Sequence, residues 1–370
     1  MSSDRNGGHL TQTAIPFFLM RGGTSRGVFM NIVDVPKDLK LLERVLIAAI
    51  GSGDPLNIDG IGGGAAVTTK VAILSKSEDE WADIDYFFAQ VGVEEQSVDF
   101  KPTCGNIMSA VGPAAIEMGL YSITQGVNKI KIRAVNTGAR VIAKVKTDGT
   151  DVVYEGKTKI DGVLGTSARI ELHFADVTGS YTGAFLPTGH LRDTIDGVDV
   201  TCMDVAVPMV IARARDVGIT GYETRKQLDA NDALFERLES IRMKAGFAMG
   251  MGDCSKSVTP KVGLLAVPQK DGNIAVRYFM PWAAHPSVAV TGSQCLAACA
   301  LTPGTVSDGL LQRPDGNSVQ VILEHPMGVM DVFVDCDQSD GFSLNSAGII
   351  RTARKLACGT FFIPKAVWEG

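Results

Sequence analysis

In this 370-residue sequence, the position of Cys104 suggests that its thiol has a chemical function. It stands directly before Gly105 and Asn106, where a helix of small residues over 107–118 is expected to begin. A helix N-terminus stabilises a thiolate, because the helix dipole and the unpaired N–H groups favour negative charge there. A free cysteine more often packs as a small buried hydrophobe, but such a cysteine does not need polar neighbours that expose their backbone. We therefore predict a functional thiol at Cys104.

Lys70 interrupts an apolar stretch over 67–74 that otherwise predicts a strand. Such a lysine either extends into solvent from an edge strand or lies in a cleft, where desolvation makes its amine a usable base. The octet over 258–265 matches 67–74 at five of eight positions and places Lys261 where Lys70 stands. A single occurrence would favour the edge-strand interpretation, so the recurrence strengthens the prediction of a functional amine.

A base and a thiol, without a metal site, a cofactor loop or a Ser–His–Asp set, favour proton transfer at carbon. Without a cofactor, only a carbon acidified by neighbouring carbonyl or conjugated carboxylate groups reacts in this way, and donors must stabilise the enolate-like intermediate. Helix N-termini near Gly105 and Ser287 supply such donors. The expected substrate is therefore a small polycarboxylate. The candidate substrate contacts are Arg21, Thr24, Ser25, Gly63, Thr69, Thr103, Gly105, Asn106, His285 and Ser287.

Two glycine motifs match catalytic or cofactor patterns but lack the elements that those patterns require. Residues 23–27 satisfy G-x-S-x-G, yet 27–31 alternates like a second strand instead of forming the helix of a hydrolase elbow. Residues 60–65 satisfy G-x-G-x-x-A, but a polar segment precedes them and a strand-like one follows, so no nicotinamide or flavin cofactor is expected. The closely spaced N–H groups of the second loop suit capture of a carboxylate, which makes Gly63 a candidate contact.

Composition and charge indicate a globular enzyme of the cytoplasm. The sequence is 45% hydrophobic and 21% charged, as globular proteins are, and its 41 glycines indicate many tight turns. A net charge of −6 and 6% aromatic residues argue against nucleic-acid partners. Residues 1–16 do not resemble a signal peptide, and no apolar run is long enough for a membrane helix. Seven scattered cysteines and five histidines, without a Cys-x-x-Cys motif, predict free thiols and no metal site.

Short β-like runs dominate the sequence, and only a few helical segments separate them. Because this order does not repeat as βαβ units, we expect an α+β fold with mostly antiparallel sheets. The expected strands are 15–19, 27–31, 71–74, 129–135, 140–145, 151–154, 169–174, 205–212, 262–267, 274–278, 319–324 and 330–335. The expected helices are 37–50, 107–118, 231–245, 288–300 and 346–358.

The repeated octet belongs to a longer internal duplication. Each copy is followed, within roughly 20 to 40 residues, by a small-residue helix, the first after Cys104 and the second after His285-Pro286-Ser287. Two features that recur in the same order favour duplication over a chance match. We therefore expect two similar domains, 1–186 and 187–370, with a functional cleft between them and with the option that the last strand returns to the first domain.

Six short motifs together resemble the 2-methylaconitate cis–trans isomerase family, and the likeness extends from residue 14 to Trp368. Within that family it is greatest to the 4-oxalomesaconate tautomerases and Δ-isomerases of gallate and protocatechuate 4,5-cleavage, on four further segments. The six family motifs are 20–27, 58–63, 69–73, 104–106, 136–138 and 186–189. The four further segments are 85–91, 198–202, 218–223 and 351–354.

The resemblance implies a diaminopimelate-epimerase-like fold of two pseudo-symmetric domains, each a curled sheet around a central helix. It also implies a cofactor-independent isomerase, a homodimer, and Lys70 and Cys104 as the catalytic pair. Epimerases of this fold use one cysteine from each half, whereas the second helix start here carries His285 and no cysteine. This departure argues for an allylic proton shift run from the first domain. Arg26 stands where many family members carry lysine, which keeps the cation in place.

Together, the residues and the resemblance predict an enzyme that shifts a proton across a three-carbon unsaturated unit of a tricarboxylate. The favoured substrate is 4-oxalomesaconate, in the degradation of aromatic compounds. The sequence does not divide the roles of base and assisting group between Lys70 and Cys104. Two alternatives stay open: an isomerase of 2-methylaconitate or methylitaconate, and a carboxylate-binding protein without catalytic activity.

Overall fold

The computed structural model describes residues 11–338 and 342–370, which form two units. Of the described residues, unit 1 contains 11–172 and 351–370, and unit 2 contains 173–338 and 342–350. The expected boundary between residues 186 and 187 differs from this division, because the segment after Leu172 bonds to unit 2. There, the backbone N–H of Ala206 donates to the carbonyl oxygen of Val177 at 2.7 Å. The first ten residues of the segment considered as a signal peptide lie outside the described residues.

Unit 1 is a mixed sheet with α1 on one face and α2 and α3 on the other. Its strand order is β1-β2-β3-β4-β6-β7-β8, and β5 pairs with β4. Residues 71, 73, 89 and 91 of β3 and β4 pack against α1, so the alternate residues of these strands face the opposite side. The elements are β1 (Gln12–Gly22), β2 (Ser25–Asn31), a 3-10 turn (Ile32–Asp34), α1 (Leu39–Ile50), β3 (Lys70–Lys76), β4 (Ile84–Val91), β5 (Val98–Asp99), α2 (Gly105–Met108), α3 (Val111–Glu117), β6 (Gly126–Ala134), β7 (Ala139–Thr147) and β8 (Arg169–Phe174).

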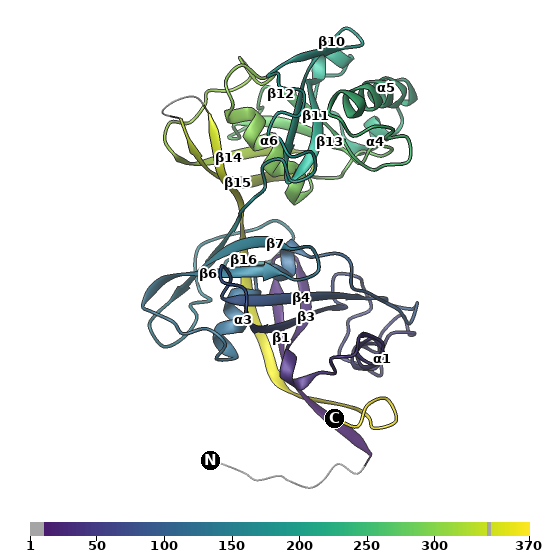
Figure 1. The fold of residues 1–370 in the computed structure, drawn as a ribbon, viewed down its shortest axis with the longest axis vertical. Helices are drawn as coiled ribbons and strands as arrows, with labels where there is room; N and C mark the ends of the chain where they lie inside the picture. Colours follow the sequence, from purple (N-terminus) through teal and green to yellow (C-terminus); the bar gives the residue numbers. More distant parts are fainter. Residues whose placement is uncertain (1–10, 339–341) are drawn as a thin grey trace. The chain divides into compact units, whose positions relative to one another are not determined.

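Unit 2 is a second mixed sheet, with α6 on one face and α5 on the other (Figure 1). Its strand order is β9-β10-β11-β12-β13-β14-β15-β16. The elements are β9 (Asp193–Ile195), β10 (Val198–Val205), β11 (Val207–Arg213), a 3-10 turn (Ala214–Val217), α4 (Arg225–Asp229), α5 (Asp232–Ala248), β12 (Lys261–Ala266), β13 (Ile274–Phe279), α6 (Val290–Leu301), β14 (Ser318–His325), β15 (Gly328–Asp337) and β16 (Ser343–Pro364). The part of β16 from Arg351 onward belongs to unit 1.

The two units repeat one order of strand pairings. In unit 1, β2 and β3 are parallel, β3 and β4 antiparallel, β4 and β6 parallel, and β6 and β7 antiparallel. In unit 2, the pairs β11–β12, β12–β13, β13–β14 and β14–β15 follow the same alternation. The helices α1 and α5 precede the second strand of the first parallel pair, and α3 and α6 lie between the strands of the second. The expected pseudo-symmetric α+β fold is confirmed, and Lys70 and Lys261 begin equivalent strands.

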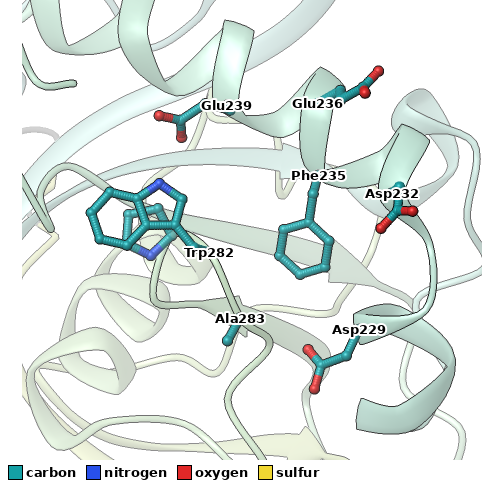
Figure 2. Close-up of a pocket in the computed structure, with 8 residues that line it drawn as sticks. Asp229, Asp232, Phe235, Glu236, Glu239, Trp282 and Ala283 are labelled. Carbon is teal, nitrogen blue, oxygen red and sulfur yellow. The ribbon is translucent and has the colours of Figure 1, made fainter. Parts of the chain in front are cut away.

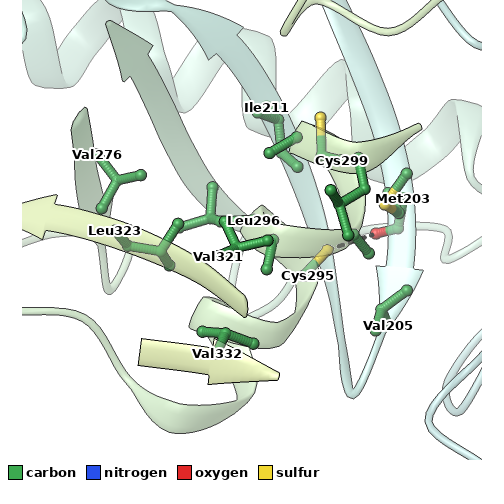
Figure 3. Close-up of a cluster of buried hydrophobic side chains, with 14 of the residues drawn as sticks. Met203, Val205, Ile211, Val276, Cys295, Leu296, Cys299, Val321, Leu323 and Val332 are labelled. Carbon is green, nitrogen blue, oxygen red and sulfur yellow. Dashed lines mark hydrogen bonds between the residues drawn. The ribbon is translucent and has the colours of Figure 1, made fainter. Parts of the chain in front are cut away.

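Helix α6 is the centre of the core of unit 2. Its residues from Gly292 to Leu301 are all buried, because alanine, glycine and cysteine let the surrounding strands approach closely. Figure 3 shows Cys295 and Leu296 among apolar side chains of the sheet, such as Val321 and Val332. The Cys295 thiol donates to the backbone oxygen of Met203 at 3.7 Å. A helix that is apolar on all sides is typical of a buried central helix.

The expected helix over 346–358 is wrong, because this segment belongs to the 22-residue strand β16. The first part of β16, up to Ile349, pairs with β15, and the part from Ala353 onward pairs with β1. A strand that changes neighbours has no single buried face along its length. The alternation that identifies a strand is therefore missing from this segment, while its alanines suggest a helix.

The expected helix over 107–118 is two short helices, α2 and α3. Pro113 explains the break, because a proline ring in a continuous helix clashes with the carbonyl group four residues earlier, here that of Ser109. The chain therefore ends α2 at Met108 and starts a new helix at Val111.

Several strand predictions also differ from the structure. The expected strand over 151–154 is reduced to a single bridge between Thr147 and Val152. Conversely, the sequence did not predict β5, β9 and β10. It also did not predict β4, which runs through the middle of unit 1 and pairs with both β3 and β6. The strand–turn–strand expected around residues 23–27 is confirmed as β1, a turn and β2.

Within residues 11–338 and 342–370, no helix is long and apolar enough to cross a bilayer. All seven cysteines are free thiols, as the sequence predicts. Five of them are buried, Cys104 is half-buried and Cys358 is exposed.

Candidate active site

Lys70 and Cys104 both border one face of β4 in unit 1. Antiparallel pairing sets Lys70 opposite Gln90, and the alternate residues Phe88 and Tyr86 lie on the same side of the strand as Gln90. The Lys70 Nζ atom lies 5.4 Å from the centre of the Phe88 ring. At the far end of this row, the Tyr86 hydroxyl donates to the backbone oxygen of Cys104 at 3.5 Å. The Tyr86 and Phe88 rings, whose centres are 6.3 Å apart, thus connect the surroundings of the amine with those of the thiol.

Gln90 holds the amine of Lys70 in position. Its Oε1 atom accepts a hydrogen bond from Lys70 Nζ at 2.5 Å. Its Nε2 atom donates to Ala66 O, Thr69 Oγ1 and Val91 O at 3.1, 3.2 and 3.2 Å. The amide therefore cannot turn round without losing these acceptors. Gln90 was not among the predicted site residues; a polar residue at the end of the alternating row 86, 88 and 90 is the signal that identifies it.

Cys104 is the residue before α2, as the sequence predicts, and its backbone is extended. Its half-buried thiol makes no hydrogen bond that caps the helix. Burial, and then the proximity of Cys104, raises the pKa of the fully buried Tyr86 phenol well above its ordinary value. Tyr86 therefore stays neutral and donates a hydrogen bond to the backbone oxygen of Cys104. The Cys104 thiol does not form a capping hydrogen bond with α2.

Glycines let α2 approach the turn between β1 and β2. A Cβ atom on Gly22 would lie 2.4 Å from the backbone oxygen of Asn106, and one on Gly23 would lie 2.2 Å from Asn106 Oδ1. A Cβ atom on Gly27 would lie 2.6 Å from the carbonyl oxygen of Lys70. Side chains at these positions would push α2 and β3 away. The glycines of this motif are therefore needed to place both candidate catalytic residues.

Asn106 connects three segments of unit 1. Its Nδ2 atom donates to Thr24 Oγ1 at 3.1 Å, and its Oδ1 atom accepts from Arg351 Nε at 3.2 Å. Arg351 lies in β16 and was not predicted as a site residue, because nothing in the sequence indicates that residue 351 lies near residue 106. Thr24 is exposed in the turn, and Gly105 is the first residue of α2.

The other predicted contacts of unit 1 are bound more tightly by the protein itself. Arg21 donates to Gly23 O, to Thr352 O and Oγ1, and to Ser167 Oγ, and burial followed by the charge of Arg354 lowers its pKa. Thr69 is buried and donates to Val91 O at 2.7 Å. Arg21 and Thr69 therefore anchor the turn and the strand start. Ser25 is buried and Thr103, next to Cys104, is half-buried.

The glycine loop over 60–65 is a loop, as expected, but some of its N–H groups are already used. The N–H of Gly62 donates to Ile50 O at 3.1 Å, and that of Gly64 donates to Asn57 Oδ1 at 2.8 Å. The expectation that this loop offers its closely spaced N–H groups to a carboxylate is therefore wrong for Gly62 and Gly64. Gly63 is exposed and lies against Arg26, since a Cβ atom there would be 2.3 Å from Arg26 Nη2. Arg26 Nε is buried and has no hydrogen-bond partner among the described residues.

His285 and Ser287 lie in unit 2, in the segment between β13 and α6. The backbone N–H of Ser287 donates to His285 Nδ1 at 3.0 Å. The neutral imidazole must therefore carry its proton on Nε2. Burial, together with the charges of Arg225 and Lys261, lowers the pKa of His285, so the ring is a neutral donor near pH 7.

An acidic hollow of about 460 Å³ on unit 2 does not suit an anionic substrate. Figure 2 shows Trp282 and Phe235 beside the carboxylates of this hollow. The carboxylates that line it are Asp229, Asp232, Glu236 and Glu239. A polycarboxylate would be repelled there, so this hollow is not the candidate active site. Among the described residues, no group of three or more His, Cys, Asp and Glu side chains is arranged to hold a metal ion.

Two pseudo-symmetric units, each with a mixed sheet and a central helix, define the diaminopimelate-epimerase-like class of proteins. The sequence profile described as "PrpF protein" matches residues 12–364. YbhH of Escherichia coli strain K12 is 46% identical over 350 residues, which cover 95% of this chain and 99% of that protein. A 4-oxalomesaconate tautomerase of Pseudomonas putida is 42% identical over 97% of this chain and 99% of that protein. The crystal structure of a methylitaconate-delta-isomerase matches 96% of this chain and 97% of that one, with a TM-score of 0.88 and 34% identity.

The chain therefore belongs to the PrpF family, and it is an isomerase. The family match extends across both units, so the likeness is not confined to the half that carries Lys70 and Cys104.

Proposed function

We propose that this isomerase converts 4-oxalomesaconate in the degradation of aromatic compounds, with Lys70 and Cys104 as its acid–base groups. The observation that carries the chemistry is that both residues border one face of β4 and are only half-buried. The choice of substrate is supported by the 42% identity to the Pseudomonas putida tautomerase over almost the whole chain. The contacts that we propose for the substrate carboxylates in unit 1 are the exposed Thr24 and the backbone N–H groups at the start of α2.

The proposed reaction moves one proton and one double bond. One group removes a proton from the carbon beside the conjugated oxo or carboxylate group, and the electron pair of the broken C–H bond delocalises as a dienolate. Either the other group returns a proton at the distal carbon, or the first group returns the proton there while the other polarises the substrate. In both cases one C–H bond breaks and one forms, and no electrons are gained or lost. Positioned acid–base groups of this kind contribute about 100- to 10,000-fold in rate. Backbone N–H groups at the start of α2 stabilise the developing charge.

Replacement of Lys70 by methionine tests the proposal. Lys70→Met removes the amine but keeps a side chain of similar length, so turnover of 4-oxalomesaconate, followed by ultraviolet absorbance, should be abolished. The circular dichroism spectrum and the binding of substrate should stay close to those of the wild type. Near-normal turnover by the variant would contradict the assignment.

A second candidate function is the isomerisation of methylitaconate or 2-methylaconitate. It is favoured by the structural match to the methylitaconate-delta-isomerase, with its TM-score of 0.88. These substrates lack the oxo group, so their carbon acid is weaker and needs a stronger base. Turnover assays with both substrate types separate the two functions. Binding without the entry of solvent deuterium into the ligand, measured by NMR, would indicate a protein that only binds carboxylates.

A further inference from the structure

The side chain of Asn136 fills a gap beside β4 in unit 1. Along the side of β4 that is turned away from β3, β6 pairs as far as Tyr86 and β5 pairs from Gln90 onward. Phe88 lies between these two positions. There, the backbone N–H of Phe88 donates to Asn136 Oδ1 at 2.8 Å, and Asn136 Nδ2 donates to the Phe88 carbonyl oxygen at 2.9 Å. The amide therefore takes the place of a neighbouring strand.

The same amide also holds the segment that leads to Cys104. Asn136 Nδ2 donates to the carbonyl oxygen of Phe100 at 2.6 Å. Phe100 is four residues before Cys104, and its ring stacks on that of Phe87 in β4, with 5.5 Å between the ring centres. Turning the amide round would set its oxygen against two carbonyl groups and its nitrogen against an N–H group, so it has one favourable orientation. Asn136 therefore joins β4 to the part of the chain that carries Cys104.

The strand β4 holds the other candidate catalytic residue as well. Gln90 of β4 accepts the hydrogen bond from Lys70 Nζ at 2.5 Å, and it lies two residues after Phe88, to which Asn136 is bound. One strand thus fixes the amine through Gln90 and the segment of the thiol through Asn136. The separation of the two groups therefore depends on the Asn136 amide as well as on β4 itself.

The turn between β6 and β7, in which Asn136 lies, does not need this side chain. The turn is closed by the backbone N–H groups of Thr137 and Gly138, which donate to the carbonyl oxygen of Ala134 at 3.2 and 2.8 Å. An asparagine that served the turn alone would bond to the backbone within it. The three hydrogen bonds of the Asn136 amide go instead to β4 and to Phe100.

We propose that Asn136 is a positioning residue for the catalytic pair. It fixes the segment of Cys104 against the strand that holds Lys70, and it acts through these two residues. The catalytic roles of Lys70 and Cys104 rest on the proposed function, whereas the link between their segments rests on the contacts of unit 1.

The substitution Asn136→Asp in the full-length protein tests this role. The carboxylate keeps the shape of the amide and an acceptor for the Phe88 N–H, but it sets an oxygen against the carbonyl groups of Phe88 and Phe100. Loss of these donors should release the segment of Cys104 from β4. Because the two catalytic groups are then misplaced, kcat should fall by about 10- to 100-fold.

The matched control is Asn128→Asp. Asn128 of β6 is 4% exposed, and its Nδ2 atom donates to Thr124 O and to Thr147 Oγ1, both at 2.8 Å. The same substitution therefore removes the same kind of donor, at contacts that involve neither β4 nor the segment of Cys104. Urea denaturation should show a lower free energy of unfolding for both variants, but in the folded protein only Asn136→Asp should lose kcat.

The reactivity of the Cys104 thiol reports its position without any substrate. Alkylation by iodoacetamide, followed by mass spectrometry of the peptide that contains Cys104, should be about tenfold faster in Asn136→Asp than in the wild type. The physical reason is that a segment released from β4 opens more often. Asn128→Asp should be alkylated at the wild-type rate. The exposed Cys358 is an internal reference, because its rate should be the same in all three proteins.

The two measurements separate the positioning role from the proposed activity. Suppose that Cys104 reacts faster in Asn136→Asp alone, but the wild type converts none of 4-oxalomesaconate, methylitaconate and 2-methylaconitate. The role of Asn136 in placing Cys104 then stands, and the proposed activity fails. An unchanged alkylation rate in Asn136→Asp, a wild-type kcat in that variant, or equal changes in Asn128→Asp would overturn the positioning role.

Discussion

At the scale of single residues, the amine of Lys70 is positioned by Gln90. The hydrogen bond of 2.5 Å from Nζ to Oε1 fixes the position of the amine, while the Nε2 side of the same amide holds the loop before β3. The Phe88 ring adds a second favourable contact for a cation. Gln90 is therefore a positioning residue for the amine of Lys70.

Substitutions of Gln90 should therefore lower kcat according to how well they hold the amine. Gln90→Met removes the acceptor, so the amine is no longer fixed and kcat should fall by about 10- to 100-fold, with KM changed much less. Gln90→Glu keeps an oxygen acceptor for Nζ and should retain more of the activity than Gln90→Met. The measurement is kcat and KM for the wild type and both variants.

Rescue by glutamate distinguishes this role from simple damage to the loop. Both variants lose the amide donors to Ala66 and Thr69, so a purely structural effect would lower kcat equally in both. Equal losses of kcat in Gln90→Met and Gln90→Glu would contradict the positioning role of Gln90.

At the scale of elements, Gly27 allows β2 to lie close to both β3 and α2. A Cβ atom at this position would meet the carbonyl oxygen of Lys70 at 2.6 Å and the Cδ1 atom of Ile107 at 3.0 Å. The first neighbour is backbone and cannot turn aside, so the strand itself must shift. Since β3 begins at Lys70 and α2 follows Cys104, such a shift would separate the two candidate catalytic groups.

Gly27→Ala should therefore lower activity, although the substitution adds only one methyl group. We expect a loss of stability of about 1–3 kcal/mol from overpacking, and a fall in kcat of up to about 100-fold from misplaced catalytic groups. The matched control is Gly359→Ala in β16, where the nearest atom to an added Cβ is Phe17 Cε1 at 3.8 Å. Urea denaturation and steady-state kinetics check both variants, and equal kcat values for Gly27→Ala and the wild type would contradict the prediction.

At the scale of the whole molecule, the end of the chain completes the first unit. β16 pairs with β15 over its first part and with β1 from Ala353 onward, so unit 1 is assembled from the two ends of the sequence. Phe361 and Ile363 of β16 are buried in the core that also contains α1. The same strand carries Arg351, which bonds to Asn106 beside Cys104.

Ile363→Ala should therefore destabilise the unit that carries Lys70, although the residue lies seven positions from the end of the chain. Ile363 is 1% exposed, and truncation of a buried isoleucine costs about 2–5 kcal/mol. Leu356→Ala in the same strand is the control, because Leu356 is 43% exposed and its truncation leaves no cavity. Thermal unfolding, with activity recorded alongside, should show a lower midpoint temperature for Ile363→Ala than for the wild type. The midpoint temperature of Leu356→Ala should equal that of the wild type.

Local features of the sequence were sufficient for part of the fold and part of the site. The repeat of Lys70 at Lys261 and the two small-residue helices predicted the duplication, because a duplicated supersecondary unit keeps its spacing. The position of Cys104 before a helix was predicted from the residues next to it. By contrast, the contact of Gln90 with Lys70 follows from the register of β3 with β4, and the sequence did not predict β4 at all.

The amino-acid sequence by itself supplied the candidate amine, the candidate thiol and the glycines around them, and it predicted the twofold repeat. Only the tertiary structure decided that 346–358 is a strand and that Arg351 meets Asn106, because the pairing of β16 joins residues more than 300 positions apart. It also decided that Lys70 has an amide partner, whereas Lys261 has none among the described residues. Local propensity cannot supply such distinctions, since they depend on which strand lies beside which.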